Sequence, residues 1–342
     1  MADKEIIRDP FKDRWILFSI KRGKRISVFN TKEKDRECVF CPGNEHLTPA
    51  AVLLLQERKG KIEKKSERRN QRIKNWLIRV IPNLYPAVRP DLSLIDKVDG
   101  TAGSLRAVGH HEIIIESPRH HQRLERMSLE QLQNILSVYR ERVDFLSQKD
   151  YVRYISVFRN YRREAGASQS HPHSQLITLP FIPSVIMQEI ERFRIYLNKG
   201  ECILCDLISK EGSKRVIWKG SSFTVLAPWF SASPYEVWII PNRHMASYPE
   251  INREEILELS AVFHSIFESL SMSLNDPPHN FWIHNSPSFI DDFHWHIEII
   301  PKTGEIGGLE QGTAVYINPI LPETTTKLLR PLFLRGIEEV KG

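Results

Sequence analysis

The sequence predicts an α+β protein made of two similar halves, each with an antiparallel sheet and a packed helix. Each half contains several short strands and one long amphipathic helix, which is the pattern of this fold class. The stretch 112–120 reappears at 236–244, with glutamate first and Arg-His last in both. A His-x-His stretch follows each of them at nearly the same distance, at 171–173 and at 294–296. Self-similarity of this kind predicts a duplicated architecture.

The length and composition are those of a soluble globular protein with two domains. The chain has 342 residues, and we expect a first domain at 1–190 and a second at 191–342. A net charge of +6 suits anionic small substrates and does not require nucleic acid as a partner. No apolar run has the length of a membrane span, and the mixed-charge N-terminus lacks the apolar core of a signal peptide. We therefore expect a cytoplasmic protein with no membrane partner.

In the first half, short apolar runs mark the strands and a capped segment marks the helix. The helix begins at Ser128, and Gln131 three residues later completes a capping-box pattern. Between Leu132 and Leu146 the apolar residues repeat at helical spacing. The expected strands lie at 15–19, 77–80, 112–116, 154–158 and in the stretch from 171 that Pro180 closes.

Two charged segments of the first half lie outside these elements. Residues 57–75 are dense in Lys, Arg, Glu and Asn, and we expect a mobile insert or a hairpin there. The segment has no aromatic residues among its charges, which argues against nucleic-acid binding. The basic run 21–25 has two interpretations, a solvated loop or guanidinium groups that reach a diphosphate.

The second half repeats the plan of the first. Its helix has Asn252 as the expected N-cap, with Glu255 three residues later, and apolar residues follow at helical spacing as far as Leu270. The expected strands lie at 223–226, 236–240, 280–283 and from 294 onward.

All four cysteines occur in two C-x-x-C pairs, and each pair is expected to bind zinc. In a cytosolic chain such a pair is typical of half a zinc site or of a redox couple. A redox pair would precede the helix of a βαβ unit, and we expect no such helix after either pair. Two thiolates and two imidazoles fill a tetrahedral zinc site and leave no position for water, so we expect two structural Zn²⁺ ions. The ligand sets that match between the halves are Cys38, Cys41, His120 and His171, and Cys202, Cys205, His244 and His294.

The stretch 171–175, His-Pro-His-Ser-Gln, is the expected catalytic strand. Residues two apart share one face of a strand, so His171, His173 and Gln175 point into one site. With His171 on zinc, His173 is left as a neutral imidazole that can attack phosphorus. Its other ring nitrogen is expected to donate to a backbone carbonyl, which sets the tautomer. Gln175 and Ser168 can donate to phosphoryl oxygens as their negative charge grows.

The second half is expected to support the first without reacting. Glu298 stands where Gln175 stands in the first half, and a carboxylate there repels a phosphate. We therefore assign the chemistry to His173 and a supporting role to His296. An alternative use of this region is a metal site with nitrogen and oxygen ligands from Glu189, His284, His296 and Glu298.

Asn160, the run 166–168 and the stretch 171–175 resemble the active-site signature of the galactose-1-phosphate uridylyltransferases, a branch of the histidine-triad superfamily. The resemblance covers nearly the whole chain. It implies two histidine-triad-like halves, a homodimer and ping-pong nucleotidyl transfer. In such a reaction His173 attacks the α-phosphorus of a UDP-hexose and expels hexose 1-phosphate. A second sugar 1-phosphate then takes the nucleotidyl group.

The same resemblance implies roles for further residues. Gln175 and Ser168 hold the α-phosphate beside His173. Two arginines reach the diphosphate from a neighbouring subunit, and other side chains contact the nucleotide, the phosphates and the hexose. These expected substrate-binding residues are Arg22, Arg25, Asn83, Asn160, Gly166 and Glu310.

Two departures from the family pattern bear on the substrate. Arg162 stands where many members have glycine, in the loop over the nucleotide. The run 312–318 replaces a glutamine-containing run, and together with the second Cys pair it is similar to the branch that includes ADP-sugar phosphorylases. The leading hypothesis is exchange between UDP-glucose and galactose 1-phosphate. The alternative is an ADP-glucose phosphorylase, or a related adenylyltransferase, with phosphate as acceptor.

Two functions of other classes are also compatible with parts of the sequence. A zinc-bound interaction protein without catalysis would use the paired cysteine knuckles and the basic segment 57–75. A nucleotide hydrolase of the smaller histidine-triad type would have a third histidine near Thr178. That histidine is missing and Gln175 is present, which favours transfer over hydrolysis.

Overall fold

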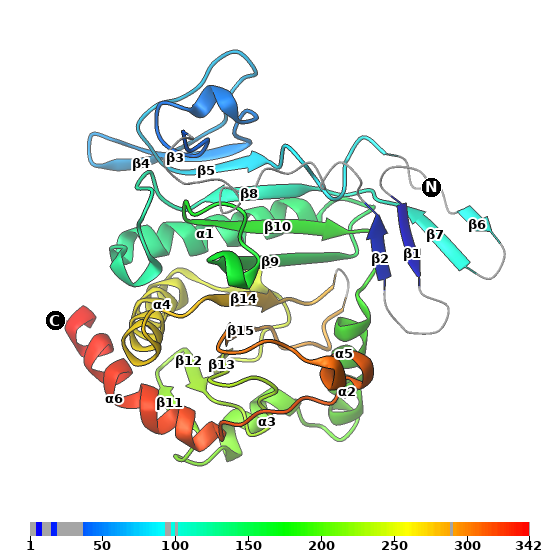
Figure 1. Ribbon diagram of the computed structural model, residues 1–342, viewed down its shortest axis with the longest axis vertical. Helices are drawn as coiled ribbons and strands as arrows, with labels where there is room; N and C mark the ends of the chain where they lie inside the picture. Colours follow the sequence, from blue (N-terminus) through cyan, green and yellow to red (C-terminus); the bar gives the residue numbers. More distant parts are fainter. Residues whose placement is uncertain are drawn as a thin grey trace.

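The computed structural model describes residues 5–8, 15–18, 37–92, 97–99, 102–287 and 290–341. Within them, the named strands form two antiparallel sheets (Figure 1). The small sheet has the order β2 (Trp15–Phe18), β1 (Glu5–Arg8), β7 (Ala102–Arg106) and β6 (Lys97–Asp99). The large sheet has the order β11 (Val216–Lys219), β12 (Phe223–Leu226), β13 (Val237–Pro241), β15 (His296–Pro301), β14 (His279–His284), β9 (Tyr154–Tyr161), β10 (His173–Leu179), β8 (His111–Ile115), β5 (Trp76–Pro82), β3 (Leu53–Arg58) and β4 (Lys61–Lys65).

Helices lie against this sheet and at its ends. The α-helices are α1 (Leu129–Ser147), α2 (Ser184–Leu197), α3 (Ile203–Lys210), α4 (Arg253–Leu274), α5 (Gly308–Thr313) and α6 (Pro322–Lys341). Within the described residues there are also four short 3-10 helices: η4 (Glu45–Leu47), η5 (Leu124–Arg126), η6 (Arg163–Ala165) and η7 (Tyr248–Glu250). In the part of the chain that is described, no helix combines the length and the apolar character needed to cross a bilayer.

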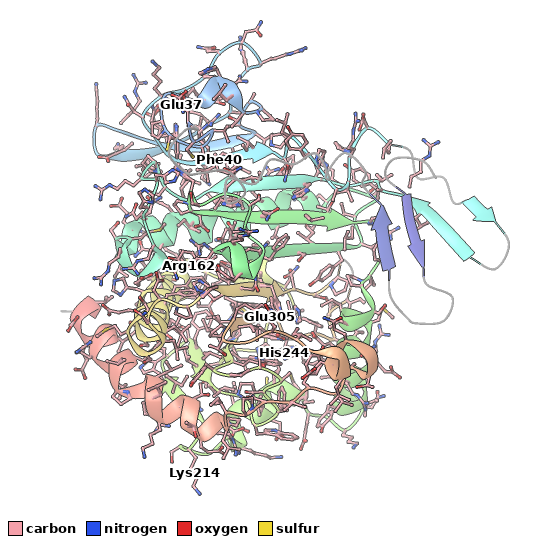
Figure 2. All side chains as sticks on the ribbon, in the orientation of Figure 1. Glu37, Phe40, Arg162, Lys214, His244 and Glu305 are labelled. Carbon is pink, nitrogen blue, oxygen red and sulfur yellow. The ribbon has the colours of Figure 1, made fainter. Side chains whose placement is uncertain are left out.

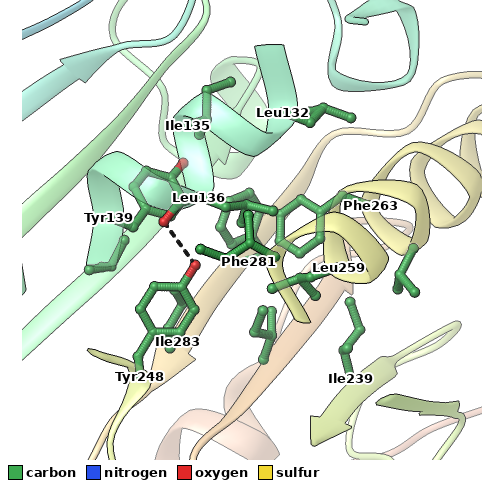
Figure 3. Packing of buried hydrophobic residues seen from close by; sticks show 14 of the residues in the cluster. Leu132, Ile135, Leu136, Tyr139, Ile239, Tyr248, Leu259, Phe263, Phe281 and Ile283 are labelled. Carbon is green, nitrogen blue, oxygen red and sulfur yellow. Dashed lines mark hydrogen bonds between the residues drawn. The ribbon is translucent and has the colours of Figure 1, made fainter. Parts of the chain in front are cut away.

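One continuous core lies between α1, α4 and the sheet (Figure 3). The apolar stripe of each helix faces the strands, as the helical spacing of these residues predicts. Leu136 of α1 and Phe263 of α4 are buried in the same cluster as Phe281 of β14. The Tyr248 hydroxyl donates to the Leu136 carbonyl at 3.1 Å, so a residue just before α4 is tied to α1. The core therefore spans both halves of the chain.

The two halves share one sheet. β9 pairs with β14, with Asn160 opposite Asn280 and Val157 opposite Ile283. Pairing of these two strands covers edges that separate sheets would leave open. The α+β class is confirmed, and the two sheets that we expected are joined into one. The duplication and the boundary between residues 190 and 191 remain predictions.

Several elements differ from the expectation. Ser128 accepts a hydrogen bond from the Gln131 amide N–H, but the Gln131 side chain donates to the Leu77 carbonyl at 3.1 Å, so only half of the capping box forms. Residues 57–75 begin with the β3–β4 hairpin, which confirms one of the two alternatives. A helix does begin inside the second cysteine pair, because α3 starts directly after Cys202. All pairings between the named strands are antiparallel, so α3 is not the helix of a βαβ unit.

The longest helix that the sequence interpretation missed is α6. Leu329, Phe333 and Ile337 recur every four residues and are buried in the main core. Pro331 lies inside the same helix and weakens the sequence signal for it. The apolar stripe packs α6 along α4 (Figure 1), and this burial outweighs the cost of the proline.

Candidate active site

His173 is the first residue of β10 and is buried. Its Nδ1 lies 2.8 Å from the carbonyl oxygen of His171. A carbonyl oxygen only accepts, so Nδ1 carries the proton and Nε2 keeps the lone pair. The expected hydrogen bond to a backbone carbonyl is therefore present. It holds the ring in the tautomer that a nucleophile at Nε2 needs.

His173 lines a cavity of about 200 Å³ at the end of β10. Three other predicted residues line it as well: Gln175, Ser168 and Asn83. Most of the remaining wall is apolar and comes from the segment 37–49 and from the end of β5. The further lining residues are Glu37, Val39, Phe40, Leu47, Thr48, Pro49, Ile81, Leu84, Tyr85, Ile113 and Gln169.

The cavity is lined by both polar and apolar side chains, and a nucleotide has groups that suit both. The ring of Phe40 lies 5.6 Å from the ring of His173, centroid to centroid, so the apolar wall begins beside the nucleophile. Phe40 and Glu37 belong to the segment above β10 and β5 (Figure 2). Apolar and aromatic walls suit a base, and amide and hydroxyl groups suit phosphate oxygens.

Asn160 and Gly166 lie next to each other, and neither is among the residues that line this cavity. Gly166 has a φ of +87°, a left-handed conformation that favours glycine. A Cβ at this position would lie 3.6 Å from the Asn160 amide nitrogen. The Asn280 amide donates to the Asn160 side-chain oxygen and to the Ala165 carbonyl, both at 2.8 Å. The loop that carries Ser168 is thus attached to β9 and β14.

Arg162 begins this loop with a φ of +66°, which is unusual for a residue other than glycine. Its guanidinium forms an ion pair with Asp276 and lies 5.5 Å from the centroid of the Tyr161 ring. Arg123 binds the same carboxylate at 3.1 Å. These contacts compensate the backbone strain, so the loop retains the glycine-like conformation with an arginine in place.

One predicted substrate-binding residue, Glu310, lies away from this cavity. Arg22 and Arg25 lie outside the described residues. Glu310 lies on α5 and lines a different cavity of about 550 Å³, together with Lys302 and Tyr316. Its carboxylate accepts a hydrogen bond from the Gly307 N–H at 3.1 Å. Within one chain, the structure does not place Glu310 beside His173.

The first predicted metal group comes together from three separate segments. Cys41 Sγ lies 3.3 Å from His120 Nδ1 and 3.6 Å from His171 Nδ1. With Zn–S bonds of about 2.3 Å and Zn–N bonds of about 2.0–2.1 Å, a tetrahedral ion keeps sulfur and nitrogen about 3.5 Å apart. His171 Nε2 donates to the Ser117 carbonyl at 2.8 Å, which leaves Nδ1 for a metal. Burial lowers the pKa of His171 to about 4, so the ring is neutral.

The second predicted metal group has similar sulfur–nitrogen distances and is formed by residues of the second half of the chain. His294 Nδ1 lies 3.5 Å from the sulfur atoms of both Cys202 and Cys205. His244 completes the group, and all four ligand atoms lie within 4.8 Å of one another. His294 Nε2 donates to the Pro241 carbonyl at 3.1 Å. Figure 2 shows Phe40, which neighbours the first group, and His244 of the second in opposite parts of the molecule.

The alternative metal group also comes together, and its imidazoles lie within ion-pair distance of its carboxylates. His284 Nδ1 lies 2.9 Å from Glu189 and 3.3 Å from Glu298. Burial alone would lower the pKa of His284, but these two carboxylates raise it above its usual value. His296 Nε2 lies 3.3 Å from Glu298. The four residues can therefore hold a metal or an internal ion-pair network.

The space over His296 is filled by aromatic rings. The Trp238 ring stacks on His296 with centroids 4.6 Å apart, and Phe293 lies on it at 6.3 Å. His173, by contrast, lines a cavity. This difference supports the assignment of the chemistry to the first half.

Sequence reasoning missed the apolar wall of the cavity and a buried histidine behind it. Phe40 lies inside the first C-x-x-C pair, and Tyr85 lies in the turn after β5, so both were near predicted site residues. His111 touches Gln175, with its Nε2 3.0 Å from the side-chain oxygen. The sequence shows that His111 and Ile113 are two residues apart and can share one face of a strand. It does not show which strand pairs with them.

The chain is similar to known proteins over most of its length. A family model described as "Domain of unknown function (DUF4921)" matches residues 109–336. The ADP-glucose phosphorylase of Arabidopsis thaliana is 32% identical, over 96% of this chain and 93% of the relative. The galactose-1-phosphate uridylyltransferase of Thermotoga maritima is 27% identical, over 95% of this chain and 98% of the relative.

Solved structures show the same relationship. The crystal structure of the Arabidopsis thaliana ADP-glucose phosphorylase with bound ADP-glucose has a TM-score of 0.74 at 31% identity, over 95% of this chain and 98% of the other. A uridylyltransferase structure has a TM-score of 0.80 at 24% identity, over 97% and 99%, and shows the shared fold. The chain therefore belongs to the DUF4921 family, and it is related to an ADP-glucose phosphorylase and to galactose-1-phosphate uridylyltransferases.

Proposed function

We propose that the protein is a nucleotidyltransferase that passes a nucleoside monophosphate from a nucleotide sugar to a phosphate acceptor through a covalent adduct on His173. One observation carries the proposal. His173 Nδ1 donates to the His171 carbonyl, which leaves the lone pair on Nε2, and His173 lines the cavity. Gln175, Ser168 and Asn83 line the same cavity and supply neutral polar groups for the phosphates.

The first step forms a nitrogen–phosphorus bond. His173 Nε2 attacks the α-phosphorus of the nucleotide sugar, and the bond to the bridging oxygen breaks. The sugar 1-phosphate leaves with the electron pair of that bond. Amide and hydroxyl donors from Gln175 and Ser168 stabilise the charge that grows on the phosphoryl oxygens.

The second step reverses the first with a different acceptor. An oxygen of the acceptor phosphate attacks the α-phosphorus, and the bond to Nε2 breaks. His173 regains its lone pair and the nucleotidyl group leaves on the acceptor. Since His171 holds the Nδ1 proton throughout, the ring needs no change of tautomer between the steps.

Zinc in the two Cys₂His₂ groups is the cofactor we propose. The donor set and the sulfur–nitrogen distances fit a tetrahedral ion in both. A closed tetrahedral site contributes folding free energy and does not bind substrate. In the first group, Cys38 and Cys41 would fix the segment that carries Phe40, and His171 would fix the start of β10.

The relatives support two donors. An adenylyl donor with phosphate as acceptor is favoured by the ADP-glucose phosphorylase, which is 32% identical. A uridylyl donor with galactose 1-phosphate as acceptor is favoured by the several uridylyltransferases that align over most of the chain.

For either donor we propose a homodimer in which Arg22 and Arg25 reach the diphosphate of the neighbouring subunit. Glu310 would bind the hexose in the same assembly.

The donor is identified by trapping the adduct. Purified protein is incubated with ADP-glucose or UDP-glucose, each radiolabelled at the α-phosphorus and without acceptor, and the acid-labile phosphoramidate on His173 is located by mass spectrometry. The nucleotide that labels His173 is the donor. The proposal is wrong if a broad panel of nucleotide sugars labels no protein.

Two variants control this experiment. His173→Ala removes the nucleophile and is expected to abolish labelling. His46→Ala removes an exposed histidine of the segment 37–49 that does not line the cavity, and it is expected to label like the wild type. Labelling that persists in His173→Ala would place the nucleophile elsewhere.

A further inference from the structure

We propose that His111 is a positioning residue that fixes the amide of Gln175 with its nitrogen toward the phosphate. The inference rests on the proposed role of Gln175 as a donor. His111 begins β8 and is buried, and it does not line the cavity. Its strand pairs with β10 so that Ile177 is opposite His111 and Gln175 is opposite Ile113. His111 and Gln175 are therefore diagonal neighbours on one face of the sheet.

The tautomer of His111 follows from a backbone contact. The Ala87 N–H lies 3.0 Å from His111 Nδ1. A backbone N–H can only donate, so Nδ1 accepts and carries no proton. The neutral ring therefore has its proton on Nε2, and Nε2 is a donor.

Among the described contacts of this Nε2, the side chains of Gln175 and Asn83 differ in whether they can accept its proton. The Gln175 side-chain oxygen lies 3.0 Å away, and the Asn83 amide nitrogen lies 3.1 Å away. The Asn83 side-chain oxygen already accepts from the Tyr85 N–H at 2.9 Å, which fixes which end of that amide faces His111. An amide nitrogen does not accept, so the His111 proton goes to Gln175.

This hydrogen bond determines what Gln175 presents to the cavity. With its oxygen on His111, the amide keeps its nitrogen as the group that faces the substrate. Without His111, the amide can rotate and place its oxygen, with a partial negative charge, toward an anion. The Ala87 N–H thus sets the tautomer of His111, and this tautomer keeps the Gln175 amide nitrogen as a donor toward the reacting phosphate.

A matched pair of variants separates positioning from a structural role. In His111→Gln the side-chain amide reaches about as far as Nε2 and can still donate to Gln175. In His111→Asn the amide reaches only about as far as Nδ1 and can only accept from Ala87. We expect His111→Asn to slow single-turnover nucleotidylation of His173 by about tenfold to a hundredfold, and His111→Gln to stay near the wild type. A purely structural role predicts the opposite order and overturns the proposal.

A double-mutant cycle tests the dependence on Gln175. If His111 acts through this amide, His111→Asn adds little to the loss caused by Gln175→Ala. Equal fractional losses in both backgrounds contradict the proposal. The dissociation constant of the nucleotide sugar is measured in parallel and is expected to change less than the rate.

A third measurement does not depend on any reaction. Nitrogen-15 spectra of histidine-labelled protein report the tautomer of each ring, and the signal of His111 is the one missing from His111→Gln. A proton on Nε2 supports the proposal, and a proton on Nδ1 overturns it. If no nucleotide labels His173, the proposed function fails and the tautomer alone decides the role of His111.

Discussion

At the scale of single residues, hydrogen bonds to the backbone decide which atoms are reactive. The His171 carbonyl holds the Nδ1 proton of His173, and the Ser117 carbonyl holds the Nε2 proton of His171. Two histidines only two residues apart thus present opposite nitrogens, one for phosphorus and one for a metal. Because the partners are backbone atoms, side-chain substitutions elsewhere do not alter these tautomers directly.

The charge at position 175 is expected to control the rate of the first step. Gln175→Ala removes one donor and should slow nucleotidylation of His173 by about a hundredfold. Gln175→Glu should slow it further, because a carboxylate repels the phosphate. Rapid-quench measurement of adduct formation at saturating donor checks both variants. Equal rates for Gln175→Glu and wild type would exclude Gln175 as a phosphate donor.

At the scale of elements, the segment 37–49 joins the first metal group to the cavity. It supplies Cys38 and Cys41 on one side and Phe40 on the other. The Trp76 indole donates to the Glu45 carboxylate at 2.9 Å, so the segment has an anchor on β5 besides the cysteines. Burial and the adjacent Cys38 raise the pKa of Cys41 to about 12, so a metal must displace a firmly held proton.

Loss of the first metal group and loss of the second are expected to affect nucleotide binding differently. Cys41→Ser should remove about one zinc per chain and weaken nucleotide binding, because Phe40 and its neighbours lose one anchor. Cys205→Ser should also remove about one zinc per chain but leave nucleotide binding near the wild type. Elemental analysis and calorimetric titration with the donor nucleotide check both. The element-level account is wrong if the two variants weaken binding equally.

At the scale of the whole molecule, the pairing of β9 with β14 joins the two halves of the chain in one sheet. His279 on β14 lies at this junction, buried, and its ring stacks on Tyr161 at 4.7 Å and lies 4.9 Å from Phe267. Its Nδ1 donates to the Pro277 carbonyl at 3.1 Å. Burial lowers the pKa of His279 to about 3.

This buried histidine is expected to make the protein sensitive to acid. The unfolded chain takes up a proton at His279 near its ordinary pKa of 6.5, and the folded protein takes it up only near 3. Stability is therefore lost as the pH falls through this window, by roughly a few kcal/mol. His279→Phe should keep the stacking and flatten this part of the pH dependence. Denaturant unfolding at several pH values checks it, with His46→Ala as an exposed control whose pH dependence should match the wild type.

The sequence alone determined the features that depend on local spacing. The two-residue period of a strand predicted that His171, His173 and Gln175 share one site, and the structure places His173 and Gln175 on one cavity. His171 lies before β10 and belongs to the first metal group instead. The spacing of the cysteine pairs and histidines was enough to predict two groups of four ligands, and both groups come together. These patterns are short-range or repeated, so one sequence shows them.

Only the tertiary structure decided which distant residues meet. The contact of His111 with Gln175 depends on the register of β8 against β10, and a shift by one residue would turn the side chains to opposite faces. The stacking of Trp238 on His296 likewise depends on the pairing of β13 with β15. Register is set by hydrogen bonds and packing over the whole sheet, and no single segment encodes it.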